Sequence, residues 1–255
     1  MRRSNPGRDV LTEPVVAGAI RGSKDFNLLG TSMLGTNMSV GVRVLLVRHG
    51  ETVWNQENRW QGQADVPLSE VGREQARRLA QRLRAERRHV RAIYASDLQR
   101  ALQTAAILGD VLGVPLIPEV GWREMDIGTW SGLTTAEVIA RYAAEWERLR
   151  AGEDLPRGGG ETFAQFQGRI LQCVRRLIER HAGEQVVVVT HGGAVRALLL
   201  HCRGLDMSQF RQIDKIGNTG VSEVTFLPTG EATIHSVNDT THLDRLPLCG
   251  EAVDA

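Results

Sequence analysis

Two short apolar segments of the chain end in the same way, and this shared ending is the strongest constraint on the fold. Residues 42–47 (VRVLLV) run directly into Arg-His-Gly at 48–50, and residues 186–190 (VVVVT) run into His-Gly-Gly at 191–193. Short runs rich in β-branched residues are typical of buried strands in parallel sheets. Ligands of open parallel sheets bind beyond the carboxyl ends of the strands. We therefore expect both histidines at one edge of a sheet, where neighbouring strands can bring them together.

The rest of the chain alternates between strand and helix patterns, which predicts an α/β fold. Further strands are expected over 92–95, 222–227 and 232–237, and helices after Ser69, from about 99 to 112, over 135–150 and 163–178, and after residue 193. Ser69 is a favoured N-cap, and apolar residues at helical spacing follow it. Strands separated by helices predict a three-layer α/β/α sandwich with a mostly parallel central sheet, and the last two strands should form a hairpin at one side.

The length of 255 residues suits one sizeable α/β domain. Residues 1–41 lack sustained periodicity and are rich in Gly, Ser and Asn, so we expect a disordered N-terminal tail, with a small regulatory arm as the alternative. The domain is expected over residues 42–242, followed by a C-terminal tail over 243–255.

The overall charge excludes some classes of partner. Lysine plus arginine (31) nearly balance aspartate plus glutamate (30), so we expect neither nucleic acid nor an anionic membrane as a partner. The arginine-rich face of the helix after Ser69 is interrupted by glutamates and is interpreted as a solvated surface. No stretch approaches the roughly 18 apolar residues that span a bilayer. The three scattered cysteines suit a reducing compartment, so a cytoplasmic protein is expected; nothing indicates its oligomeric state.

The residues around the two histidines suit the binding of an anion. The glycines that follow each histidine let the backbone approach a ligand, and the helix after His191 offers N–H groups and the positive end of its dipole. A single histidine at a strand end is more often structural. Two of them, with Arg48 beside the first, favour a functional site.

Residues 46–55 (LVRHGETVWN) resemble the signature of the histidine phosphatase superfamily, which has the phosphoglycerate mutase-like fold. Further segments resemble the family's later motifs and follow in its order, at residues 61–72, 96–105, 123–132 and 189–193. The resemblance covers about residues 42–242, and no catalytic position departs from the family pattern. Several motifs in series are far more specific than any one of them.

The resemblance implies a role for each central residue. His49 would accept the phosphoryl group, since a neutral imidazole is a nucleophile at neutral pH. Arg48 and Arg100 can each fork onto phosphate oxygens, and His191 would complete this clamp. Glu124 would donate a proton to the leaving oxygen and later act as base toward water. The implied substrate-binding residues are Asn55, Gln61, Gly62 and Gly192.

Three functions share these motifs. The leading hypothesis is a phosphomonoester hydrolase that acts through a phosphohistidine on a small phosphorylated metabolite. The alternatives are a 2,3-bisphosphoglycerate-dependent phosphoglycerate mutase and a non-catalytic phospholigand sensor. A sensor has no need of a nucleophile and an acid together. The family's mutases carry a lysine-bearing insertion after the acid segment, whereas the stretch between Glu124 and His191 has no lysine, and acidic residues offset its arginines. A second phosphate should find little positive potential there, which favours the hydrolase.

Neither a metal nor a cofactor is expected. The sequence has no HExxH motif or similar ligand set, and the three glycines at 158–160 lack the Lys-Ser/Thr of a P-loop. Specificity should lie within about residues 126–162, although the substrate itself is not indicated. Glu161 is interpreted either as a helix cap or as a residue at the mouth of the site. The remaining histidines are assigned to the surface or to packing: His89, His181, His201, His235 and His242.

Overall fold

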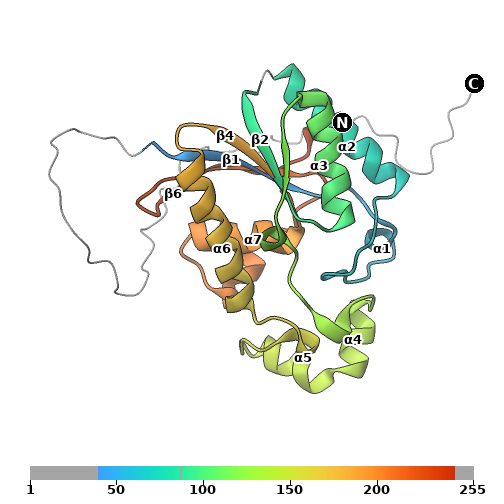
Figure 1. Ribbon diagram of the computed structural model, residues 1–255. Helices are drawn as coiled ribbons and strands as arrows, with labels where there is room; N and C mark the ends of the chain where they lie inside the picture. Colours follow the sequence, from blue (N-terminus) through green and yellow to red (C-terminus); the bar gives the residue numbers. More distant parts are fainter. Residues whose placement is uncertain (1–39, 87, 245–255) are drawn as a thin grey trace, which may run out of the picture.

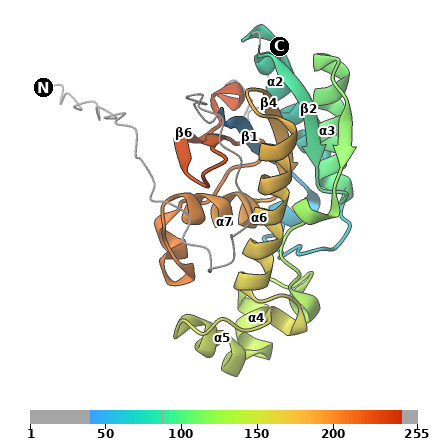
Figure 2. The ribbon, with the colours of Figure 1, turned by 60° about the vertical axis from the view of Figure 1, so that its left-hand side comes forward.

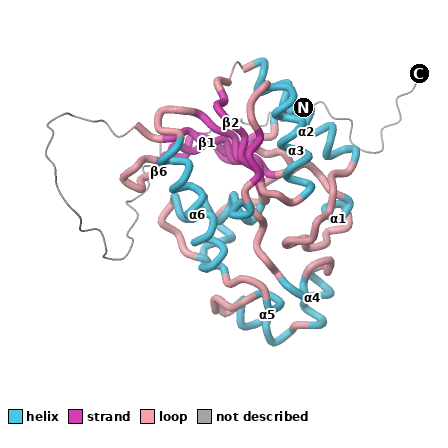
Figure 3. Tube along the Cα trace, in the orientation of Figure 1, coloured by secondary structure: helices cyan, strands magenta, loops and turns pink. Residues whose placement is uncertain are grey.

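A computed structural model describes residues 40–86 and 88–244, and within these residues a six-stranded sheet runs through the centre (Figures 1 and 3). Its strands are β1 (Val42–Arg48), β2 (Val90–Ala95), β3 (Leu116–Pro118), β4 (Gln185–Thr190), β5 (Val221–Phe226) and β6 (Ala232–Asp239), in the order β3-β2-β4-β1-β5-β6. Strands β3, β2, β4 and β1 are parallel, and the β5–β6 hairpin joins β1 in antiparallel fashion. The predicted sheet is confirmed.

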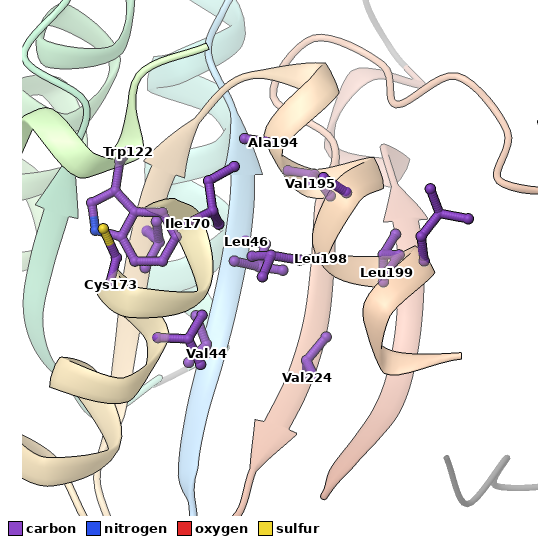
Figure 4. Close-up of a cluster of buried hydrophobic side chains, with 14 of the residues drawn as sticks. Val44, Leu46, Trp122, Ile170, Cys173, Ala194, Val195, Leu198, Leu199 and Val224 are labelled. Atoms are coloured by element: carbon purple, nitrogen blue, oxygen red, sulfur yellow. The ribbon is translucent and has the colours of Figure 1, made fainter. Parts of the chain in front are cut away.

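Some of the helices form a layer on each face of this sheet, and others lie beyond its edge. The helices are α1 (Val53–Gln56), α2 (Glu70–Ala85), α3 (Gln99–Leu112), α4 (Thr135–Arg141), α5 (Ala143–Arg150), α6 (Phe163–Arg180) and α7 (Gly192–Cys202). Because successive side chains of a strand point to opposite faces, Leu45 and Val47 cluster with residues of α2 and α3, while Val44 and Leu46 cluster with residues of α6 and α7. Figure 2 shows these helices on the two sides of the sheet. Figure 4 shows the second interface. The predicted three-layer sandwich is confirmed.

Two local predictions differ from the structure. The single helix expected over 135–150 is broken at Tyr142, whose backbone leaves the helical region (φ −127°, ψ 38°). The break lets the aromatic rings of Tyr142 and Trp146 both pack at 6.1 Å from Trp130, and α4 and α5 project away from the sheet (Figure 1). Strand β3 was not expected, because two prolines flank its short apolar stretch. As an edge strand that pairs with β2 alone, it tolerates them.

Short 3₁₀ turns connect the larger elements. They are η1 (Val120–Trp122), η2 (Gly128–Trp130), η3 (Arg157–Gly159), η4 (Met207–Gln212) and η5 (Thr241–Leu243). The predicted tails, residues 1–41 and 243–255, fall almost wholly outside the described residues, so these boundaries stay a prediction. Among the described helices, none combines the length and the apolar character that a membrane crossing requires.

Candidate active site

The two histidines lie side by side because β1 and β4 are neighbours. Arg48 and Thr190 are partners in the parallel register, so the residue after each strand emerges at the same edge. The backbone nitrogen of His49 donates to the carbonyl oxygen of Thr190 at 2.9 Å, and the ring centroids of His49 and His191 are 5.2 Å apart. The predicted meeting of the two histidines is confirmed.

The hydrogen bonds of His49 leave one ring nitrogen free to react. Its Nδ1 lies 2.7 Å from the carbonyl oxygen of Gly50, which can only accept, so Nδ1 carries the proton. The lone pair is therefore on Nε2. The pKa of His49 lies well below its ordinary value, because burial disfavours the imidazolium and the guanidinium groups of Arg100 and Arg48 repel it. The ring is neutral at physiological pH.

His191 has the opposite tautomer. Nε of Arg100 donates to its Nδ1 at 3.2 Å, so Nε2 carries the proton and lies 2.9 Å from Oγ of Ser96. Burial lowers the pKa of His191, and the charge of Arg100 lowers it further. Both ring nitrogens are thus engaged with protein groups. For His191 to contact a phosphate as predicted, one of these two hydrogen bonds would have to break. In the present structure His191 instead holds the guanidinium of Arg100 in position.

Arg48 and Arg100 are buried without a carboxylate partner in hydrogen-bond contact. Nη1 of Arg48 donates to the carbonyl oxygen of Ile216 at 2.6 Å, and its buried Nε has no partner among the described residues. Nη1 and Nη2 of Arg100 donate to the carbonyl oxygens of Ala64 and Gly62 at 2.6 and 2.7 Å. Burial lowers the pKa of Arg48, and it lowers that of Arg100 to about 10, so Arg100 stays cationic at neutral pH. Buried, unpaired guanidinium groups are well suited to bind an anion.

A small network around Thr52 holds the two predicted amide ligands. Asn55 belongs to the capping box of α1, where its Oδ1 accepts from the nitrogen of Thr52, which leaves its Nδ2 available. Nε2 of Gln61 donates to Oγ1 of Thr52 at 2.8 Å, and its buried Oε1 has no partner among the described residues. Nε2 carries two hydrogens, so Gln61 can donate one to Thr52 and keep the second for a ligand.

Glu124 is held at the start of α7, on the loop between η1 and η2. Its Oε1 accepts from the nitrogen of Met125 and its Oε2 from the nitrogen of Gly193, each at 2.9 Å. The close approach requires glycine, because a Cβ atom at position 193 would lie 2.3 Å from Oε1 of Glu124. Each carboxyl oxygen has a second lone-pair site, so the group can still carry a proton.

Behind Glu124, Arg169 of α6 fixes the same loop. It makes a two-pronged ion pair with Glu161 at 2.8 and 2.9 Å. Its remaining N–H groups donate to the carbonyl oxygens of Gly121, Arg123 and Glu124 at 2.9, 3.0 and 3.2 Å. Glu161 also accepts from the nitrogen of Asp126 and does not cap α6, whose N-cap is Thr162. The interpretation of Glu161 as a cap is wrong.

The segment of three glycines at 158–160 packs against the backbone of residues 126–128, in the loop that follows Glu124. Position 158 has a left-handed φ of 56°, and a Cβ atom there would lie 2.4 Å from the carbonyl oxygen of Ile127. A Cβ atom at position 160 would lie 2.3 Å from the carbonyl oxygen of Asp126. Backbone packs directly on backbone here. These glycines therefore serve to position Arg157 and Glu161, which flank them, beside the loop of Glu124.

All nine predicted site residues line one cavity of about 220 Å³. They are Arg48, His49, Asn55, Gln61, Gly62, Arg100, Glu124, His191 and Gly192. The cavity is also lined by residues that were not predicted: Arg59, Gly193, Arg196, Lys215 and Ile216. Arg196 could have been found from the sequence, because it is a charged residue within the largely apolar helix α7. No sequence pattern points to Lys215, because it lies in an irregular loop.

The five remaining histidines were predicted to lie on the surface or in the packed interior, away from the site. None of the histidines at 89, 181, 201, 235 and 242 lines this cavity or its neighbour. Within residues 40–86 and 88–244, no three His, Cys, Asp or Glu side chains gather in a way that could hold a metal ion. The arginine-rich face of α2 pairs with acidic residues, for example Arg78 with Glu74.

Comparisons with known proteins agree with this fold and site. The sequence profile of the histidine phosphatase superfamily (branch 1) matches residues 44–240. The chain is 35% identical to phosphoglycerate mutase-like protein 4 of Arabidopsis thaliana over 205 residues, covering 79% of this chain and 86% of that protein. It is 36% identical to a metal-independent phosphoserine phosphatase of the same plant over 215 residues, covering 83% and 87%.

A solved structure is similar over most of the chain. A phosphoserine phosphatase variant of Entamoeba histolytica in complex with phosphoserine has a TM-score of 0.71 and 27% identity, covering 79% of this chain and 99% of that one. The chain belongs to the histidine phosphatase superfamily. These matches confirm the predicted enzyme class, a metal-independent histidine phosphatase.

Proposed function

We propose that the protein hydrolyses phosphomonoesters of small metabolites through a phosphohistidine intermediate. The observation that carries this proposal is the geometry of His49, whose neutral ring keeps its Nε2 lone pair free in a cavity that Arg48, Arg100 and Glu124 also line. The arginines neutralise the phosphoryl oxygens, which otherwise repel a nucleophile. The related phosphoserine phosphatases support hydrolysis as the outcome.

In the first step the lone pair of His49 Nε2 forms a bond to phosphorus while the ester P–O bond breaks. The carboxyl proton of Glu124 passes to the leaving oxygen, so the alcohol departs neutral. In the second step the carboxylate of Glu124 takes a proton from water as the water oxygen bonds to phosphorus. The N–P bond breaks, inorganic phosphate leaves, and both residues return to their starting protonation states.

The size of the site supports a small substrate. The cavity of about 220 Å³ suits a phosphoryl group with little else, and a second cavity of similar size adjoins it. Neither nucleic acid nor a membrane is proposed as a partner. A cytoplasmic location is part of this proposal and is supported by the free, buried thiols of Cys173 and Cys202.

The mutase remains a second candidate, because several relatives are named phosphoglycerate mutase-like or probable phosphoglycerate mutase and both reactions share the first step. A phospholigand sensor is a weaker one. The backbone donors that hold the Glu124 carboxyl beside the cavity, Met125 and Gly193, have no purpose in a protein that only binds phosphate.

The test is the covalent intermediate. Incubation with a ³²P-labelled phosphomonoester should label the protein, with the acid-labile and base-stable chemistry of phosphohistidine, and should release phosphate. His49→Ala should abolish both. His201→Ala is the matched control, because His201 lies outside both cavities. Near-normal turnover by His49→Ala would overturn the mechanism.

The role of Glu124 has its own test. Glu124→Gln should slow alkyl esters, which need a proton on the leaving oxygen, about 100-fold, and aryl esters much less. An equal loss on both kinds of ester would indicate a binding role instead.

A further inference from the structure

A second cavity, of about 250 Å³, adjoins the first and differs from it in character. Its wall is mostly apolar and aromatic, formed by Trp60, Met125, Ile127, Phe163, Phe166 and Phe210. Five residues line both cavities: Gln61, Gly62, Glu124, Gly193 and Arg196. Because the proposed proton donor stands where the cavities meet, a leaving group that faces Glu124 extends into the second one.

The guanidinium of Arg157 in this apolar wall has no hydrogen-bonded partner within the part of the chain that the structure describes. The side chain of Arg157 makes no hydrogen bond or ion pair with any residue that the structure describes, and burial lowers its pKa. The carboxylates of Glu124 and Asp154 lie near enough to offset part of this shift, but neither is in hydrogen-bond contact with Arg157. The neighbouring acids bind other groups instead. Asp154 accepts from the nitrogens at the start of α6, and Glu145 accepts from the nitrogen of Gly158. Glu161 is paired with Arg169. The charge of Arg157 is therefore available to a ligand.

A second guanidinium, that of Arg196, borders the same cavity. It donates to the carbonyl oxygens of Ile213 and Phe210 at 3.0 and 2.6 Å and lies 3.6 Å from the ring centroid of Phe210. Burial lowers its pKa, and the nearby carboxylates of Asp214 and Glu124 offset part of that shift. Arg196 thus already has hydrogen-bond acceptors and nearby acids, whereas the side chain of Arg157 has no hydrogen-bond acceptor among the described residues.

We propose that the second cavity binds the leaving group of the substrate, and that this group is ring-sized, largely apolar and carries one carboxylate, which pairs with Arg157. The inference rests on the proposed hydrolase function. An apolar cavity of about 150 Å³ holds benzene, so the present one, of about 250 Å³, has room for a ring and a carboxylate. A planar guanidinium matches a carboxylate in two-pronged fashion.

A second phosphate group fits this cavity less well. A phosphate dianion carries twice the charge of a carboxylate, so it loses more hydration free energy when it enters a cavity with a largely aromatic wall. The structure therefore favours a carboxylate over a phosphate at this position.

The test uses two matched pairs of esters, with phosphate release as the readout. Phenyl phosphate is compared with 3-carboxyphenyl phosphate, and glycerol 3-phosphate with 3-phosphoglycerate. We expect the carboxylated member of each pair to have a kcat/KM about 10- to 100-fold higher, as a charge-assisted hydrogen bond at a desolvated site provides. The gain from the carboxylate should be larger on the ring.

Arg157→Gln should reduce this preference to less than about 3-fold, and Arg157→Lys, which keeps the charge without the fork, should retain part of it. Arg150→Gln is the matched control, because it removes an exposed arginine of the same segment that lines neither cavity, and it should keep the full preference. Equal kcat/KM values within each pair for the wild type would overturn the proposal, as would a preference that survives in Arg157→Gln. Preference for a bisphosphate over both carboxylates would also overturn it. Absence of phosphate release from every ester would instead reject the hydrolase itself.

Discussion

The backbone nitrogen of Gly193 donates a 2.9 Å hydrogen bond to Oε2 of Glu124, and this contact joins the loop of the proposed acid to the helix that begins after His191. The nucleophile and the acid come from segments far apart in the sequence. Their relative position depends on how closely α7 approaches the carboxyl group. A side chain at position 193 would fill the space that Glu124 occupies.

We therefore predict that Gly193→Ala displaces Glu124 without destabilising the fold. Turnover of alkyl phosphates should fall about 100-fold, the usual contribution of a general acid, while aryl phosphates lose much less. Gly168→Ala, in the middle of α6 with open space around it, is the control and should leave turnover unchanged while adding up to about 1 kcal/mol of stability. Full activity of Gly193→Ala on alkyl esters would mean that this contact does not place the acid.

Arg169 should act on turnover through the position of Glu124. Arg169→Gln leaves Glu161 unpaired and frees three carbonyl oxygens, so we expect a loss of about 2–3 kcal/mol in the free energy of unfolding. The kcat for alkyl esters should fall more than that for aryl esters. Arg148→Gln breaks an exposed pair with Glu153 and should cost less than about 1 kcal/mol, with no change in the ester ratio. A purely structural role would lower stability and leave that ratio unchanged.

Gly158 and Gly159 should differ in how much stability is lost when each is replaced by alanine. Gly158→Ala combines a left-handed φ with a Cβ atom 2.4 Å from a carbonyl oxygen, so it should cost about 2–4 kcal/mol. Gly159→Ala also has a left-handed φ, of 81°, but meets open space and should cost only about 1–2 kcal/mol. Urea unfolding of both variants measures the difference. Equal losses would show that backbone packing between residues 126–128 and 158–160 is unimportant.

The sequence was sufficient for features that depend on local pattern and on the rules of parallel sheets. His49 and His191 could be placed together because residues after neighbouring parallel strands share an edge. The break at Tyr142 could not be predicted, because it depends on the packing of that ring near Trp130, which comes from another loop.

The charges around the second cavity show what a charge count from the sequence does not predict. Counting residues between Glu124 and His191 predicted little net positive potential. The structure distributes these charges unevenly, since the acids bind backbone nitrogens or other arginines while Arg157 faces the cavity. The count therefore did not indicate that a guanidinium without a hydrogen-bonded acid lines this cavity. Which acid meets which partner is decided by tertiary structure alone.

Acid should destabilise the protein through its buried histidines. The pKa of His49 and that of His191 are lowered in the folded state, mainly by burial, so below about pH 6.5 the unfolded chain binds more protons. The free energy of unfolding should therefore decrease as the pH falls below that value, by up to about 2 kcal/mol for each histidine at pH 5. Urea titrations at pH 7.5 and pH 5 should show a smaller decrease for His49→Asn. An identical decrease in the variant would mean that His49 does not contribute.

The last prediction concerns the acceptor of the phosphoryl group. A mutase must hold the second phosphate of a bisphosphate while the phosphohistidine persists. Here the space beyond Glu124 is largely aromatic, and it offers the unpaired fork of Arg157 in place of a lysine-bearing insertion. We therefore expect water to be the acceptor.

With 3-phosphoglycerate and a trace of 2,3-bisphosphoglycerate, free phosphate should accumulate and little 2-phosphoglycerate should form, as followed by ³¹P NMR. Arg157→Gln should slow phosphate release from 3-phosphoglycerate without creating mutase activity. Rapid formation of 2-phosphoglycerate with little free phosphate would establish the mutase instead, because both products arise from the same phosphoenzyme and differ only in what attacks it.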